Sequence, residues 1–240
     1  MNVTAPTPTL TFRPAAERGR FDHGWLDARH TFSFGGYRDP AWMGFRSLRV
    51  MNEDRIAPGM GFGEHPHRDM EILTYVLDGA LAHRDSLGHA EALPAGSFQY
   101  MSAGAGIEHS EFNASDERPV HLYQIWILPA QRGLKPVYGQ LDLNPADAHN
   151  RWQVIAAPIG HGGALPIRQD AIVKLARLES NRTLSHELTG GRGAWVQVLR
   201  GNVTLNGAAL AAGDGAAAEG LGRLELQAGE HAEVLLFDLA

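Results

Sequence analysis

The chain has 240 residues and no cysteine, and its 21 basic and 27 acidic residues give a net charge of −6. The absence of thiols excludes disulfides, thiolate nucleophiles, zinc knuckles and iron–sulfur clusters, and the acidic balance predicts no nucleic-acid partner. No apolar run is long enough to span a bilayer and no secretory leader is evident, so we expect a cytoplasmic protein.

Short apolar or alternating runs, separated by glycine-rich turns, predict an almost entirely β chain. In chain order, the predicted strands lie at 43–51, 71–79, 97–104, 121–128, 194–201, 202–207 and 233–239. Residues 168–178 fit either a helix or a strand, and we favour a strand. A spacing of about ten residues with glycine turns is typical of a β-sandwich or barrel rather than of alternating strands and helices.

A weak internal repeat predicts two similar β units. YVLDG (75–79) is matched by QVLRG (197–201), and LPAG (93–96) is matched by LAAG (210–213). Each copy ends in an apolar strand, and the connection at 130–170 is rich in proline and glycine. We therefore expect two β-barrels, with one domain at 1–135 and the other at 136–240.

Two short histidine stretches form a candidate metal site. In GEHPHRDME (63–71), His65 and His67 alternate along a predicted strand, so both imidazoles point to the same face. In GAGIEHSEFN (104–113), His109 and Glu111 have the same spacing. Imidazoles combined with a carboxylate suit Fe(II), Mn(II), Co(II), Ni(II) or Cu(II). Four protein ligands on a six-coordinate metal leave room for a substrate and dioxygen, whereas structural sites are usually closed.

The spacing of these residues resembles the two motifs of the cupin superfamily. The first motif is matched by Gly59, His65, His67 and Glu71, although its last glycine falls one residue late at Gly79. The second motif is matched by Gly106, His109 and Asn113, with Gly104 in place of its proline. Two motifs in register about forty residues apart are a specific signature.

Longer stretches resemble the pirin family of cupins, and most of all its bacterial quercetin 2,3-dioxygenase-like members. These stretches are HGWLDARHTFSF (23–34), HPHRDMEILTYVLDG (65–79), HRDSLGH (83–89), MSAGAGIEHSEFN (101–113) and HLYQIWILP (121–129). The resemblance runs from about residue 14 to the C-terminus and is densest at 23–129. It implies an all-β bicupin of two jelly-roll barrels packed together, with a metal site in the N-terminal barrel only.

The resemblance also implies the ligand set, which is His65, His67, His109 and Glu111, with Glu111 as the catalytic proton acceptor. The generic cupin pattern would choose Glu71 instead, which shares the face of His67 if the strand is regular. With Glu111 as ligand, Glu71 is expected to support a ligating imidazole or the structure. The implied cofactor is one divalent transition metal, with Fe(II) as first choice and nickel, manganese, cobalt, copper or zinc as alternatives.

The C-terminal half lacks this ligand pattern. LSHELTGGRGAWVQV (184–198) contains only His186, which we expect at the surface or the core edge, and GDGAAAEG (213–220) contains no histidine. The HRDSLGH stretch is more simply a polar hairpin turn than a pocket mouth. Five apolar residues could line a cavity above the metal or form plain barrel core: Phe62, Met101, Phe112, Tyr123 and Ile125.

Two functions from different classes fit these residues. The resemblance implies a dioxygenase that cleaves a flavonol such as quercetin and releases carbon monoxide. The alternative is a metal- and redox-sensing binding protein that regulates a transcription factor or a metabolic enzyme. An isomerase or decarboxylase reaction on the same scaffold is a third interpretation. We expect a monomer that binds a flavonol-like small molecule and dioxygen, but no nucleic acid and no membrane.

Overall fold

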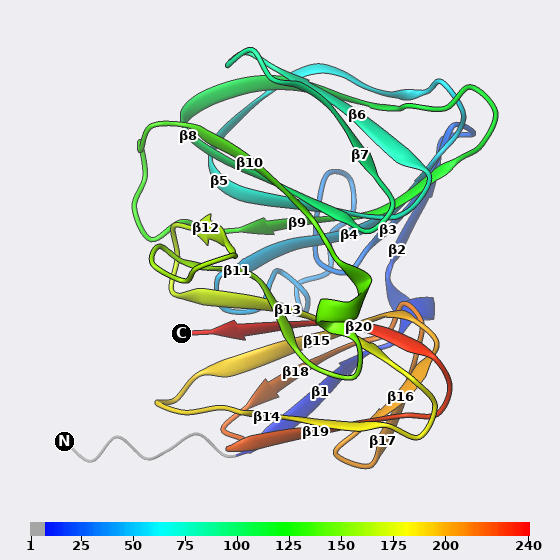
Figure 1. The fold of residues 1–240 in the computed structure, drawn as a ribbon, viewed down its shortest axis with the longest axis vertical. Coiled ribbons are helices and arrows are strands. Elements are labelled where there is room, and N and C mark those ends of the chain that lie inside the picture. The colour runs from blue at the N-terminus through cyan, green and yellow to red at the C-terminus, as the bar shows by residue number, and fades with distance from the viewer. Residues whose placement is uncertain (1–7) are drawn as a thin grey trace. The chain divides into compact units, whose positions relative to one another are not determined.

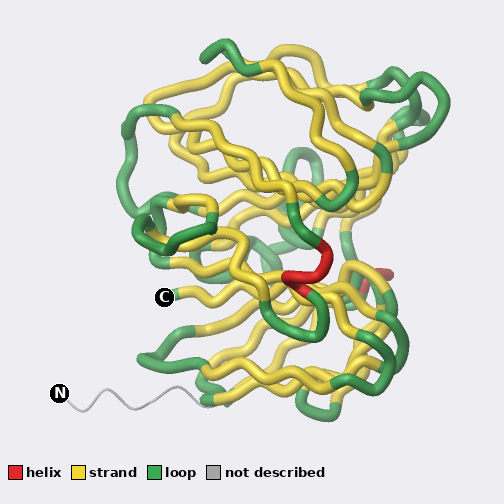
Figure 2. The backbone as a smooth tube through the Cα atoms, viewed as in Figure 1, coloured by secondary structure: helices red, strands yellow, loops and turns green. Residues whose placement is uncertain are grey.

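The structure, a computed structural model, describes residues 8–240, and their regular structure is nearly all β (Figure 1). Within these residues the helices are two short 3₁₀ turns, drawn red in Figure 2: η1 (Ala15–Glu17) and η2 (Pro145–Ala148). Neither has the length or the apolar character that crossing a bilayer requires. The prediction of an all-β chain is therefore confirmed, and the ambiguous segment 168–178 forms a strand over Ala171–Leu178.

One compact unit comprises residues 19–143 and 165–169. Its nine-stranded sheet has the order β2-β3-β4-β9-β5-β8-β6-β7, with β10 paired to β8. The strands are β2 (Gly19–Asp22), β3 (Leu26–His30), β4 (Leu48–Ile56), β5 (Gly61–Asp78), β6 (Ala80–Asp85), β7 (Ala90–Pro94), β8 (Ser97–Asn113), β9 (Val120–Ile127) and β10 (Val137–Asp142). The short β12 (Leu165–Ile167) belongs to the same unit.

The core of this unit shows that its sheet closes on itself. Leu26 on β3 and Leu93 on β7 lie far apart in the strand order, yet they belong to one buried cluster. The cluster consists of Leu26, Ala28, Ile56, Val76, Leu81, Leu93, Val120 and Leu122. Full burial of each larger aliphatic side chain contributes about 1.5–3 kcal/mol, so this core holds the strands in a barrel. Figure 1 shows β5 and β8 as long, strongly curved strands.

The second unit comprises residues 8–18, 144–164 and 170–240 within the described chain. Its strands are β1 (Thr9–Arg13), β11 (Gln153–Pro158), β13 (Ala171–Leu178), β14 (Thr183–Glu187), β15 (Gly193–Arg200), β16 (Asn202–Leu205), β17 (Ala208–Ala211), β18 (Gly215–Glu219), β19 (Arg223–Ala228) and β20 (Ala232–Leu239). They form two sheets, β1-β18-β15-β20-β13-β11 and β14-β19-β16-β17. Buried residues of both sheets, such as Val196 and Leu226, make one core.

The N-terminal segment joins the second unit because β1 pairs along its whole length with β18. This pairing joins residues about 200 positions apart in the chain, and no local pattern in the sequence points to it. The functional division at 135/136 stays a prediction.

The internal repeat has a counterpart in each unit. Gly79 follows β5 and Gly201 follows β15, and both have a positive φ, +80° and +72°. Gly96 and Gly213, from the matched LPAG and LAAG stretches, both have a φ of +88°. The two copies therefore use the same pair of left-handed glycine turns, which is why these four positions carry the sequence repeat.

Gly104 lies where β8 shifts its register against β5. Its φ is +48°, and a Cβ added there would overlap the carbonyl oxygen of Leu134. Strain and overlap add, so we expect Gly104→Ala to lower the free energy of unfolding by about 3 kcal/mol, or to prevent folding. The Cβ that Gly63→Ala adds on β5 meets open space. This variant should therefore change the free energy of unfolding by less than about 1 kcal/mol. Urea denaturation that gives equal effects for both variants would contradict this account.

A buried ionic network lies in the second unit around Asp238. His186 is 8% exposed, and its Nε2–H donates to Asp238 Oδ2 at 2.8 Å. Lys174 Nζ donates to the Nδ1 of the same imidazole at 3.3 Å. The guanidinium of Arg192 also bonds the Asp238 carboxylate. The predicted place of His186 at the surface or core edge is thus refined: its ring is buried and belongs to this network.

The network predicts a pH-dependent loss of stability. Burial alone would raise the pKa of Asp238, but hydrogen bonds from His186 and Arg192 outweigh it and lower the pKa. We expect Asp238→Asn to cost about 2–3 kcal/mol of unfolding free energy at pH 7. A carboxylate whose pKa is depressed in the folded state stabilises the fold above its unfolded pKa, which is near 3.9. The difference in unfolding free energy between the wild type and Asp238→Asn should therefore shrink as the pH falls below about 4. Asp147→Asn is the control, since the half-exposed Asp147 forms a surface ion pair with Arg151 at 3.2 Å and its loss should cost less than about 0.5 kcal/mol. Equal losses in urea titrations would refute the assignment.

Candidate metal centre

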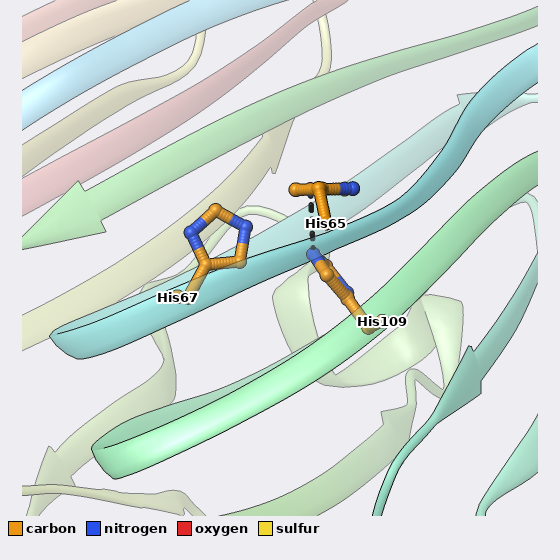
Figure 3. A group of neighbouring side chains, drawn as sticks. All are labelled: His65, His67 and His109. Atoms are coloured by element: carbon orange, nitrogen blue, oxygen red, sulfur yellow. Dashed lines mark hydrogen bonds between the residues drawn. The ribbon is translucent and has the colours of Figure 1, made fainter.

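Three imidazoles from two neighbouring strands meet at one point (Figure 3). One ligand nitrogen of each of His65, His67 and His109 lies within 4.8 Å of the others. His65 and His67 come from β5 and their rings contact each other, as strand alternation predicts. His109 lies directly opposite His65 on β8. The structure therefore brings together the three histidines that the sequence singled out.

The hydrogen bonds of His65 fit a shared cation. Its Nδ1–H donates to the carbonyl of Gly63 at 2.8 Å, so the lone pair of the neutral ring is on Nε2. That Nε2 lies 3.0 Å from the Nε2 of His109. Two nitrogens bound at right angles about 2.1 Å from one ion lie roughly 3 Å apart, so the spacing matches two ligands of one metal.

Burial keeps the imidazoles of His67 and His109 neutral, which metal binding requires. It lowers the pKa of His67 to about 4, with a smaller effect from His65. Burial, followed by the neighbouring imidazoles, lowers the pKa of His109 to about 2. Both rings therefore offer lone pairs throughout the neutral pH range.

Glu111 groups with His83 and His109 rather than with the other two histidines. It is 2% exposed, and its Oε2 accepts a hydrogen bond from Gln124 Nε2 at 2.7 Å. Its Oε1 is buried and has no hydrogen-bond partner among residues 8–240. Burial raises the pKa of Glu111 to about 7, against the opposing effects of the Gln124 and Thr74 side chains. One carboxylate oxygen is thus held, and the other can take a proton or a cation.

Glu71, the choice of the generic cupin pattern, lies outside this centre. Its buried carboxylate accepts hydrogen bonds from the hydroxyls of Tyr100 and Ser102 and from the backbone N–H of Arg168. The alternation of β5 is interrupted at Asp69, which has a φ of +65° beside a register shift. Glu71 therefore does not share the face of the histidines, as it would on a regular strand. It anchors the segment 165–169 to the barrel.

His65 and His67 border a cavity of about 520 Å³. Its aromatic walls are Phe21, Phe34, Phe62 and Trp126, and its polar side chains include Asn52, Asp54, Glu111 and Gln124. Of the five apolar residues that could have lined it, Phe62 does. Three are buried core, namely Met101, Tyr123 and Ile125, and Phe112 is 40% exposed. A flat aromatic molecule fits a cavity of this size and lining.

Family models and relatives agree with this geometry. A model described as Pirin matches residues 11–127, and one described as quercetinase C-terminal cupin domain matches residues 154–239. A protein of Escherichia coli K12 named quercetin 2,3-dioxygenase is 48% identical over 231 residues, which cover 96% of this chain and 98% of the relative. The chain belongs to the pirin family.

Solved structures extend the likeness to the whole fold of this pirin. The crystal structure of YhhW from Escherichia coli has a TM-score of 0.94 at 46% identity, over 97% of this chain and 98% of that one. The bacterial pirin YhhW in complex with nickel(II) has a TM-score of 0.92 at 46% identity, over 96% and 99%. The predicted bicupin, with one cupin in each half of an all-β chain, is confirmed.

The HRDSLGH stretch of this pirin forms the predicted polar hairpin turn, since β6 and β7 pair on either side of it, but two of its side chains are also buried. His83 and Asp85 are buried, and His83 Nε2 lies 3.1 Å from Asp85 Oδ2. His83 lies opposite Glu111 on β8, and its ring stacks on Tyr138. The available signal was the alternation of His83 and Asp85 along β6, which places both side chains on one face.

Two further polar residues of the cavity, Asn52 and Asp54, were also missed from the sequence. They lie in strand β4 (LRVMNEDRI), where Asn52 and Asp54 flank Glu53 and so share one face of the strand. Carboxylates and amides in a strand are ordinarily solvent-facing, so nothing in their residue types marks them as cavity residues. Here that face lines the cavity.

Proposed function

We propose that this pirin is a metal-dependent dioxygenase that cleaves flavonols such as quercetin, consuming dioxygen and releasing carbon monoxide. One observation carries the proposal: three imidazoles meet beside an aromatic cavity that His65, His67 and Glu111 line, and one oxygen of the Glu111 carboxylate has no hydrogen-bond partner within the described residues. The name of the Escherichia coli relative, quercetin 2,3-dioxygenase, supports the substrate class.

We propose that His65, His67, His109 and Glu111 hold one divalent metal, with Fe(II) as first choice. The lone pair of His65, its distance to His109 and the free Glu111 oxygen support this set. Both groups of potential ligands in the described chain belong to the unit at 19–143. When bound, the metal would supply a Lewis acid for the flavonol oxyanion and a position for dioxygen.

In this proposal Glu111 accepts the proton of the flavonol 3-hydroxyl. Its pKa of about 7 lets the carboxylate take a proton near neutral pH and return it. Gln124 orients it: Trp126 Nε1–H donates to the Gln124 amide oxygen at 3.3 Å, so the amide nitrogen faces Glu111. General-base help of this kind contributes about 10²–10⁴ in rate.

The aromatic walls have two tasks. Phe34 and Trp126 meet edge to face, with ring centroids 5.3 Å apart, so their faces are fixed before substrate arrives. Such surfaces hold a planar ring system and displace water from the reacting end. We further propose that residues 1–135 carry the metal-binding function and that 136–240 is a scaffold. A cytoplasmic location and a monomeric state stay predictions.

Oxygen uptake with quercetin tests the proposed function. Protein purified without chelator should contain close to one divalent metal per chain by elemental analysis. It should then consume one dioxygen and release one carbon monoxide per flavonol. Protein stripped with chelator should be inactive and recover when metal is restored. Metal-loaded protein that consumes no oxygen with quercetin or related flavonols would contradict the proposal.

A further inference from the structure

Two polar side chains of β4 interrupt the wall of the cavity. Asn52 and Asp54 lie on the face of the strand that lines it, and they are 3% and 4% exposed. The intervening Glu53 does not line the cavity and bonds His121 at 2.9 Å. The neighbours of Asp54 on the adjacent strands are apolar, Ala28 on β3 and Leu122 on β9. A carboxyl group is thus set into an apolar wall.

This arrangement is unfavourable for stability. The Asn52 Oδ1 is buried without a hydrogen-bond partner within the described residues. Burial and nearby carboxylates, Glu111 first among them, raise the pKa of Asp54 to about 7. A buried polar atom without a partner costs about 1–3 kcal/mol, so an apolar residue at position 52 would favour folding more. Residues that break such a rule are expected where function requires them.

The cavity connects this polar pair with the candidate metal centre. Its lining includes His65, His67 and Glu111 as well as Asn52 and Asp54, and aromatic rings line the rest. A flavonol is a rigid, flat molecule, so with its 3-hydroxyl at the histidines its other rings must lie along these walls. A phenolic hydroxyl both donates and accepts a hydrogen bond. A carboxyl oxygen and an amide oxygen in the wall are suitable partners.

We propose that Asp54 and Asn52 bind a second phenolic hydroxyl of the substrate, and that they thereby select flavonols with hydroxylated outer rings. The inference rests on the proposed function, because it assumes that a flavonol occupies the cavity. A site built to hydrogen-bond a hydroxyl rejects an analogue that lacks it, since the polar groups of the site then stay unpaired.

Flavonol binding by zinc-loaded protein tests this inference without turnover. The probes are quercetin and 3-hydroxyflavone, which keeps the 3-hydroxyl but has no hydroxyl on its other rings. Quenching of tryptophan fluorescence reports binding, since Trp126 lines the cavity. The wild-type protein should bind quercetin at least about tenfold more tightly than 3-hydroxyflavone. Asp54→Leu should remove most of this preference by weakening quercetin alone.

Three further variants sharpen the test. Asp54→Asn keeps a donor and an acceptor and should keep part of the preference. Asn52→Ala tests the same inference if Asp54→Leu does not fold. It should lower the preference for quercetin over 3-hydroxyflavone at least about threefold. Glu53→Gln makes a similar chemical change one residue away, on the other face of β4, and should leave the preference unchanged.

The outcomes separate this inference from the proposed function. A preference that survives in both Asp54→Leu and Asn52→Ala overturns the inference, as does wild-type protein that binds both probes equally. Wild-type protein that binds neither probe overturns the proposed function and the inference with it. Selective binding that depends on Asp54, in a protein that consumes no oxygen, supports the inference and refutes only the dioxygenase activity.

Discussion

Glu111→Gln is expected to lower the turnover of quercetin by about 100- to 10,000-fold while the protein retains most of its metal. The amide has the shape of the carboxyl group and can still contact Gln124, but it cannot accept a proton at neutral pH. Three imidazoles remain to hold the cation. The loss corresponds to about 3–5 kcal/mol of transition-state stabilisation.

Stopped-assay kinetics and elemental analysis of the same preparation measure both halves of this result. Glu108→Gln is the matched control, since Glu108 lies on the same strand but is exposed to solvent. It should have wild-type turnover and metal content. If Glu111→Gln turns over at the wild-type rate, Glu111 is not the base; if it loses its metal entirely, its role as a ligand outweighs its role as a base.

His109→Ala is expected to abolish metal binding and turnover together. His109 is the one residue common to both groups of candidate ligands, and its ring contacts those of His65 and His67. The alanine removes a central nitrogen and leaves a void where water competes for the ion. Loss of one protein ligand from such a set should reduce affinity by far more than the 10–100-fold typical of outer-shell changes.

The metal content of desalted protein measures this effect, with an expected fall from about one ion per chain to less than about a tenth. His161→Ala is the control, since His161 is exposed and lies in the other unit. Far-UV circular dichroism shows whether the barrel persists. A folded His109→Ala protein that holds its metal as firmly as the control would refute the assigned ligand set.

The sequence predicts well whatever depends on regular alternation. His65 and His67 share a face because they are two residues apart on one strand, and His109 lies opposite them because β5 and β8 are antiparallel neighbours. The glycine turns of the internal repeat were visible for a similar reason, since only a few residue types tolerate their backbone geometry.

Prediction from sequence failed where a strand is irregular or a face is formed by distant chain segments. The positive φ of Asp69 interrupts β5, so counting residues from the histidines gave Glu71 the wrong face. The burial of His83 follows from the barrel closing around β6, and that of Asp54 from the pairing of β4 with β3 and β9. No periodicity in one strand reveals which side of it meets a cavity.

Diffraction from crystals loaded with nickel(II), recorded at the nickel absorption edge, tests the metal centre most directly. We predict one strong anomalous peak, with imidazole nitrogens of His65, His67 and His109 and an oxygen of Glu111 about 2.0–2.2 Å away. The remaining coordination positions should face the aromatic cavity. A peak bound elsewhere on the protein, or none at these histidines in a metal-replete crystal, would contradict the account.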